Sequence, residues 1–188
     1  SHLFWLGSLC DWAADGGLPE AAVDLLGLTK LTPLLKDEGG IRPIAGRECL
    51  RKLTARALVR EHKATLLEAV GQHQFGAGRP GGAEILVHTM QVVSEADPDR
   101  AWVQLDVQNA FPSVSRRAVL DAVAEHAPAL LPLAETFLRR TSSFLYLGAD
   151  GRGEELHATL GVEQGDVLGP LLFAVGFRRP VERLRAAL

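Results

Sequence analysis

Several residue types are scarce in this sequence of 188 residues, and each scarcity excludes a class of protein. Two cysteines, Cys10 and Cys49, are too few for a disulfide framework or for a zinc site of their own. No apolar run reaches the roughly 18–20 residues that a membrane span needs, so no membrane partner is expected. The opening SHLFWLGSLC lacks the basic region of a signal peptide. An intracellular, reducing compartment is therefore expected, with no distinction between nucleus and cytoplasm.

The remaining composition is that of an ordinary globular protein, with 47% hydrophobic and 23% charged residues. The length is enough for one domain with a real core, or for one domain and part of another. The first residue is Ser1 and the single methionine is Met90. The last stretch, VERLRAAL, has a helical pattern without a stop signal. We therefore expect both ends to be processed or cut.

The charges are unevenly distributed along the chain. The net charge of −3 argues weakly against a nucleic-acid partner. Between Lys30 and Lys63, however, nine basic and four acidic residues give a local excess of five positive charges. Phosphate groups respond to this local field and not to the total charge. Four of these basic residues follow one another at helical spacing: Lys52, Arg56, Arg60 and Lys63.

The hydrophobic pattern predicts helices and hairpins without regular βαβ alternation, which indicates an α+β fold. Two hairpins are predicted, over residues 28–44 with Gly39-Gly40 in the turn, and over residues 142–160 with turn signals at Gly148–Gly153. Helices are predicted within 1–28, over 47–70, over about 83–95, from a Ser115 cap to Pro128, on to Arg139-Arg140, and from Gly169 to the end.

Two of the predicted elements have a predicted buried face. In the helix over 47–70, the apolar stripe consists of Leu50, Leu53, Ala57, Ala64 and Leu67. Residues 101–107 alternate as a strand, with Ala101, Val103, Leu105 and Val107 on one face and Trp102, Gln104 and Asp106 on the other. A carboxylate between apolar neighbours is costly to bury alone. Asp106 is therefore expected to cap an element, pair with a cation or bind a metal.

Two stretches resemble known motifs, and three more support them. LDVQNAFPSV (105–114) and GVEQGDVLGPLLF (161–173) resemble motifs A and B of the reverse transcriptase palm, in the form found in retrotransposons without long terminal repeats. LLKDEGGIRPI, RECLRKLTARALVR and QFGAGRPGGAE resemble the fingers hairpin, the next fingers helix and the loop after it. The five stretches stand in the family's order and cover about residues 28–178. The resemblance implies an RNA-directed DNA polymerase.

The implied fold is a right-hand polymerase fingers/palm. After an N-terminal helical segment (1–28), a partial reverse transcriptase domain covers 29–188. Its fingers take about 29–95 and 113–160, and its palm takes about 96–112 and 161–188. The implied partners are an RNA template, a DNA or RNA primer and deoxynucleoside triphosphates. No oligomeric state is implied.

The resemblance also implies the roles of individual residues. Asp106 and the backbone carbonyl of Val107 would bind Mg²⁺ (or Mn²⁺) in a two-metal nucleotidyl transfer. Phe111 matches the steric gate that excludes a ribose 2′-hydroxyl, although Pro112 replaces a frequent Asp. The remaining matches are Gln164 and Gly165 against the incoming nucleotide, Lys36 and Arg42 on its triphosphate, and Lys52, Arg56, Arg60 and Arg79 on the template. Asp166 is not assigned to a metal.

One part of the family pattern has no match in this sequence. The third palm motif carries two adjacent aspartates, and no Asp-Asp pair occurs here. A palm that lacks this hairpin and the thumb is incomplete, so the 188-residue chain alone is expected to be inactive, and the activity belongs to the intact product. Two alternatives stay open. One is a degenerate or repurposed reverse-transcriptase-like RNA-binding protein without catalysis, and the other is an RNA-synthesising relative, against which Phe111 argues.

Overall fold

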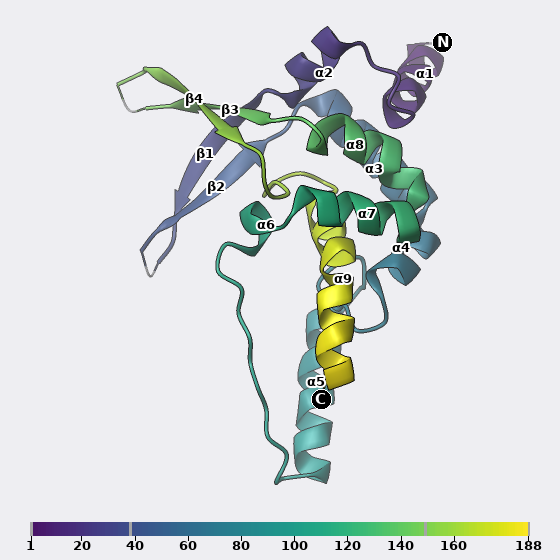
Figure 1. Ribbon diagram of the computed structural model, residues 1–188, viewed down its shortest axis with the longest axis vertical. Coiled ribbons are helices and arrows are strands. Elements are labelled where there is room, and N and C mark those ends of the chain that lie inside the picture. Colours follow the sequence, from purple (N-terminus) through teal and green to yellow (C-terminus); the bar gives the residue numbers. More distant parts are fainter. Residues whose placement is uncertain (1, 38, 149, 188) are drawn as a thin grey trace.

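The structure is a computed structural model that describes residues 2–37, 39–148 and 150–187 (Figure 1). Its helices are α1 (His2–Ala14), α2 (Glu20–Gly27), α3 (Cys49–Glu61), α4 (Lys63–Val70), α5 (Gly82–Ala96), α6 (Ala110–Ser113), α7 (Arg116–His126), α8 (Leu131–Leu138) and α9 (Gly169–Ala187). Its strands are β1 (Thr29–Leu35), β2 (Ile41–Gly46), β3 (Ser142–Leu147) and β4 (Gly153–Ala158). This mixture of helices with one small sheet is compatible with the predicted α+β class.

The sheet joins the two predicted hairpins in the order β2-β1-β3-β4. Both hairpins are confirmed as antiparallel pairs. They meet through a parallel pairing of β1 with β3, in which Thr29 lies opposite Phe144 and Leu31 opposite Tyr146. The two hairpin tips point away from the helices (Figure 1). The sheet therefore projects from a helical body.

The helical core lies where α7 crosses α9, beside α4 and α8. The largest side chains with almost no exposed surface include Leu66, Leu130, Val119, Val123 and Val175. A Cβ added at Gly176 of α9 would lie 2.7 Å from Val119 Cγ2, so a glycine lets these two helices approach closely. This crossing holds the C-terminal helix against the middle of the chain.

The prediction for residues 47–70 is wrong in two respects. The segment forms two helices, α3 and α4, separated at His62. The buried face of α3 consists of Arg51, Thr54, Ala55 and Leu58, whereas Leu53 is 43% exposed and Ala57 lies at the surface. The apolar pattern misled the prediction because Arg51 is buried on an ion pair with Asp166, which lies far away in the sequence.

The predicted strand over residues 101–107 is also absent. This part of the chain has no regular structure and belongs to the long connection from α5 to α6 (Figure 1). Val103 and Leu105 of its predicted buried face are 81% and 70% exposed. Within the described ranges, no backbone hydrogen bond joins 101–107 to another segment. Alternation favours a strand only where a neighbour can pair with it, and here none does.

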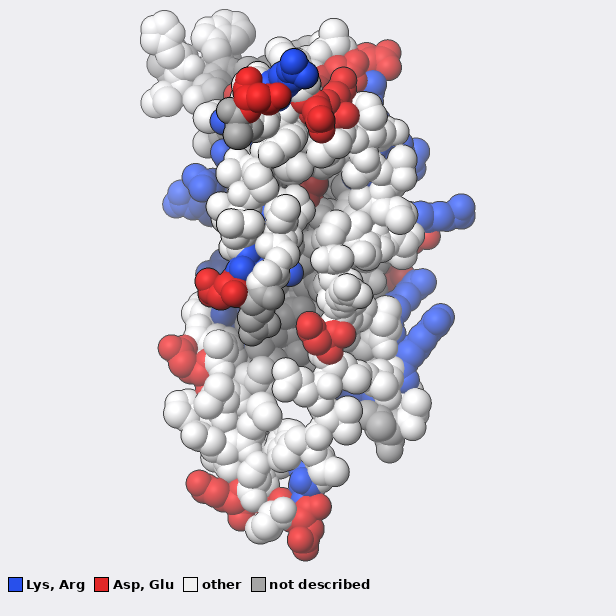
Figure 2. All heavy atoms as spheres, turned by 90° about the vertical axis from the view of Figure 1, so that its left-hand side faces the viewer, with Lys and Arg blue, Asp and Glu red and all other residues white. Residues whose placement is uncertain are grey.

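Helix α5 is almost entirely exposed. Gly82 is its one buried residue. It lies against the carbonyl of Phe75, with which an added Cβ would collide. Large apolar side chains of α5 face outward, among them Ile85, Val87 and Val92. On the face that carries the hairpins and the connection to α6, Asp and Glu are scattered from top to bottom, and Lys and Arg lie mostly at the edges (Figure 2). None of the described helices is long and apolar enough to cross a membrane.

Candidate functional site

The two motifs meet where α6 contacts the loop before α9. The amide of Val162 donates to the carbonyl of Phe111 (2.9 Å), and the amide of Gly161 donates to the carbonyl of Val114 (2.8 Å). Gly161 has a positive φ of 80°, and a Cβ there would collide with Pro112. The end of the first motif is thus fixed to the start of the second, with a glycine required at the contact.

Phe111 is held by an aromatic stack. Its ring lies parallel to that of Phe173, with 5.0 Å between centroids, and Phe173 stacks on Phe177 at 5.3 Å. Phe173 and Phe177 are one helical turn apart on α9. The stack on α9 fixes the orientation of the Phe111 ring. Sequence reasoning did not identify Phe173, although its i, i+4 spacing to Phe177 was a usable signal.

Gln164 and Gly165 lie against strand β2. The amide of Ala45 donates to the carbonyl of Gln164 (2.8 Å). Gly165 has a φ of 102°, and a Cβ there would lie 2.6 Å from the carbonyl oxygen of Ala45. The close approach that needs this glycine is therefore to the protein's own backbone. Gln164 Oε1 is buried, and no described residue donates a hydrogen bond to it.

A pocket of about 200 Å³ lies beside Gln164, between the sheet and α6. Its lining includes Pro43 and Ala45 of β2, Pro112 of α6, Arg116 of α7 and Gln164. Arg116 is already satisfied by three neutral acceptors: the carbonyls of Gly161 (2.9 Å) and Arg140 (2.6 Å) and the hydroxyl of Ser142 (2.9 Å). Among the described lining residues, Gln164 Oε1 and Glu163 Oε2 are buried acceptors without a hydrogen bond, and Glu163 pairs with Arg47. Because Oε1 has almost no exposed surface, a hydrogen bond from a bound hydroxyl group requires the Gln164 side chain to turn toward the pocket.

Buried charges surround the second motif, and sequence reasoning missed them. Arg47 forms an ion pair with Glu163, and Arg51 forms one with Asp166. Burial, helped by the nearby Arg51, lowers the pKa of Arg47 to about 9, while Asp166 opposes this shift. Arg47 therefore remains a cation at neutral pH. No local pattern marks this cluster, because its acids and bases come from distant segments.

Asp106 belongs to no group of metal-ligand side chains among the described residues. It is exposed in the connection between α5 and α6, as is Val107. The residues that the structure describes contain no group of three or more His, Cys, Asp or Glu side chains that could hold a metal ion. One carboxylate and one carbonyl do not fit the ligand demand of two Mg²⁺ ions. The predicted metal site is thus not assembled by these residues.

Lys36 and Arg42 belong to the β1–β2 hairpin and are both exposed. Lys36 sits at the turn, where its amide donates to the carbonyl of Gly40 (3.1 Å). Arg42 lies opposite Leu34, three residues before the Ala45 that holds Gln164. No ion pair is formed by either cation among the described residues. The hairpin thus carries two exposed cations, Arg42 on the strand that also supports the second motif and Lys36 at the turn.

Three of the four predicted stripe cations line one groove. Arg56, Arg60 and Lys63 border a space of about 570 Å³, and the loop at 76–78 and the start of α9 close its other side. The groove is otherwise apolar, with Leu66, Leu67, Pro170 and Leu171 among its lining residues. Lys52 lies on the same helix but does not line the groove.

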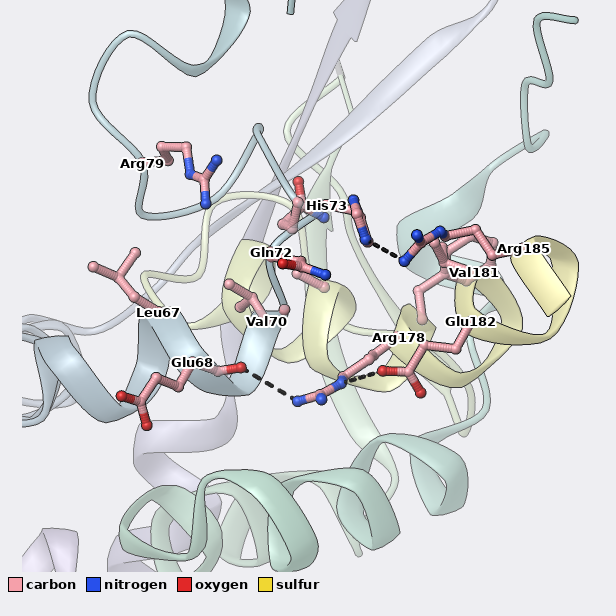
Figure 3. Close-up of a pocket in the computed structure, with 14 residues that line it drawn as sticks. Leu67, Glu68, Val70, Gln72, His73, Arg79, Arg178, Val181, Glu182 and Arg185 are labelled. Atoms are coloured by element: carbon pink, nitrogen blue, oxygen red, sulfur yellow. Dashed lines mark hydrogen bonds and ion pairs between the residues drawn. The ribbon is translucent and has the colours of Figure 1, made fainter. Parts of the chain in front are cut away.

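Arg79 lines a different pocket, of about 510 Å³, between the end of α4, the following loop and α9 (Figure 3). Its guanidinium lies 4.9 Å from the Phe75 ring centroid. In the same pocket, Arg178 donates to the carbonyls of Glu68 (3.2 Å) and Ala69 (3.1 Å) and pairs with Glu182 (2.7 Å), while Arg185 contacts His73. The structure therefore separates Arg79 from the Arg56 groove.

Comparison with known proteins adds one relative. The chain is 32% identical, over 167 residues and 84% of its length, to a protein named retrotransposable element SLACS 132 kDa protein from Trypanosoma brucei gambiense. It spans 13% of that protein's length. No family model matches the chain. The chain is thus similar to part of a protein of a retrotransposable element.

Proposed function

We propose that the chain is the fingers and upstream palm of a retroelement reverse transcriptase. The contact between α6 and the loop before α9 is the observation that carries this proposal. It joins the segment of Phe111 to the segment of Gln164 and Gly165, and this pair lies against β2. The similarity to a retrotransposable element protein supports the same reading. The reaction of the intact product is RNA-directed DNA synthesis, with transfer of a nucleotide to a primer 3′-hydroxyl.

The nucleotide site combines the residues at this junction. The Phe111 ring, backed by Phe173, supplies a rigid surface that leaves no room for a 2′-hydroxyl on the incoming sugar. The amide oxygen of Gln164, buried in the free chain, turns toward a hydroxyl of that sugar and accepts a hydrogen bond from it. Arg42 and Lys36, on the adjoining hairpin, bind triphosphate oxygens.

The template site is the groove beside Arg56, Arg60 and Lys63. Their cations bind backbone phosphates, and the apolar lining between them receives base faces. The partner is a single RNA strand, which the groove holds without reading its sequence. Lys52 extends the basic stripe toward the start of α3, whereas Arg79 makes a separate contact.

The metal-binding part of the site needs more carboxylates than these residues supply. Asp106 is the proposed first ligand of Mg²⁺ in the intact product, with Val107 beside it. Because a single exposed carboxylate does not fit two ions, we expect no primer extension by the 188-residue chain alone. The exposure of Asp106 outside any group of metal ligands in the described residues also favours the second candidate, an RNA-binding protein without catalysis.

Primer extension by the intact product on an RNA template separates the two candidates. With Mg²⁺ and deoxynucleotides, we expect extension that Asp106→Asn abolishes. Phe111→Ala should increase the use of ribonucleotides relative to deoxynucleotides, whereas Phe4→Ala, at an exposed ring on α1, should not. No extension by the unaltered intact product would leave the RNA-binding candidate.

A further inference from the structure

Two carboxylates bracket the proposed nucleotide-binding pair. Glu163 stands immediately before Gln164, and Asp166 immediately after Gly165. Their side chains are only 8% and 7% exposed. Both carboxylates are therefore buried, whereas Gln164 between them is half-buried and Gly165 is exposed. The backbone of the pair is anchored from both sides.

Each carboxylate is held by an arginine, one from just before α3 and one from its first turn. Arg47 pairs with Glu163, Arg51 pairs with Asp166, and Arg47 Nε lies 3.9 Å from Asp166. A second contact fixes each acid: Ser142 Oγ donates to Glu163 Oε1 (3.0 Å), and the amide of Leu168 donates to Asp166 Oδ1 (2.9 Å). The two acids are thus oriented by charge and by hydrogen bonds.

The arginines are themselves held in place. The Arg51 guanidinium lies 3.8 Å from the centroid of the Phe137 ring on α8. Arg47 Nη1 donates to the carbonyl of Gly27 (2.8 Å) and to the hydroxyl of Thr29. These partners belong to α2, β1 and α8. The two arginines therefore connect the loop to three other elements of the fold.

We infer that Arg47 and Arg51 are positioning residues, which set the place of Gln164 and Gly165 against β2 by holding Glu163 and Asp166. A buried ion pair is a poor source of stability compared with an apolar pair of the same size. Its directional bonds specify one arrangement of the loop, as they do in other buried polar networks. The meaning of this role for nucleotide binding rests on the proposed function.

Hydrogen exchange at the Ala45 amide tests the inference in the 188-residue chain. This amide donates to the carbonyl of Gln164, so its protection reports the docked loop. Asp166→Asn keeps the size of the side chain and an acceptor for Leu168, but removes the charge that Arg51 needs. We expect protection at Ala45 to fall by about tenfold or more, since hydrogen bonds to charged groups are the strong ones.

A double variant separates positioning from stability. Arg51→Met with Asp166→Asn removes both charges, so we expect it to recover the melting temperature lost by Asp166→Asn. Protection at Ala45 should stay low. If Ala45 protection recovers together with the melting temperature, or never falls, the inference is wrong. The matched controls are Arg117→Met and Asp121→Asn, which alter an exposed pair on α7 and should leave Ala45 unchanged.

A second measurement tells this inference apart from the proposed function. Binding of dGTP in the presence of Mg²⁺ is followed by NMR on the same variants and on the unaltered chain. Weaker binding in Asp166→Asn and in the double variant, with normal binding in the controls, supports both the positioning role and the nucleotide site. If the Ala45 amide responds as expected but the unaltered chain binds no dGTP, the loop anchor stands and the nucleotide site in this chain is overturned.

Discussion

Replacing Gly165 by alanine should show how tightly the second motif is seated on β2. Two separate costs arise. A φ of 102° is a strained conformation for an L residue, which costs about 1–3 kcal/mol. In addition, the new Cβ would lie 2.6 Å from the carbonyl oxygen of Ala45, so the loop must move and lose the bond from the Ala45 amide, at about 1 kcal/mol.

The expected total is a loss of about 2–4 kcal/mol in the free energy of unfolding. For a chain of this size, that lowers the melting temperature by about 5–15 °C. Urea denaturation followed by circular dichroism measures the first quantity, and a thermal scan measures the second. The result should be a large effect from one added methyl group.

Gly151→Ala is the matched control for the backbone strain. Gly151 also has a positive φ, of 76°, but an added Cβ would meet no atom of the described residues within 4 Å. We expect it to cost only the strain, about 1–2 kcal/mol. Equal losses for the two variants would refute the reasoning, because the contact with Ala45 would then contribute nothing.

The remaining predictions concern the buried face of α3, the charge of Arg47 and the basic groove. In urea denaturation, Leu58→Ala should cost about 2–4 kcal/mol and Leu53→Ala less than about 1 kcal/mol, since Leu58 is buried and Leu53 is exposed. A larger loss from Leu53→Ala would mean that the apolar stripe predicted from the sequence is the buried face. Because burial lowers the pKa of Arg47 in the folded chain to about 9, below its ordinary value in the unfolded chain, the unfolded state keeps a proton that the folded state loses above about pH 9. The free energy of unfolding of the unaltered chain should therefore rise relative to that of Arg47→Met as the pH increases above about 9. Between pH 6 and 8 the difference between the two free energies should stay constant. Urea denaturation at a series of pH values measures both. Arg56→Gln with Arg60→Gln should weaken binding of a single RNA strand and reduce the slope of log K against log salt by about 1.4, whereas Arg117→Gln with Arg152→Gln, at exposed sites outside the groove, should leave both unchanged.

Local signals in the sequence were sufficient for several elements. The Gly-rich turns predicted both hairpins, and Ser115 caps α7 as expected, accepting a hydrogen bond from the Ala118 amide (3.3 Å). Gly169-Pro170 opens α9 as predicted. In each case the deciding residues lie within a few positions of one another. Such contacts can be read from one segment alone.

Long-range pairings could not be read in this way. The parallel contact of β1 with β3 joins residues 29–31 with residues 144–146, which lie far apart in the sequence. The burial of Arg51 depends on Asp166, which lies 115 residues further along the sequence, and no pattern within α3 indicates it. Residues 101–107 have the pattern of a strand but no partner within the described chain. The pattern states what a segment can form, and its neighbours decide the outcome.

The connection between α5 and α6 divides the molecule in an unusual way. It is exposed, and residues 101–107 make no backbone hydrogen bond to another segment of the described chain, so this is where a protease would cut first. Yet the core contains residues from both sides of it, with Leu66 and Val70 from one side and Val119 and Val175 from the other. The two halves, cut or expressed as separate polypeptides, should therefore remain together as one noncovalent complex, held by the packing of α4 against α7 and α9.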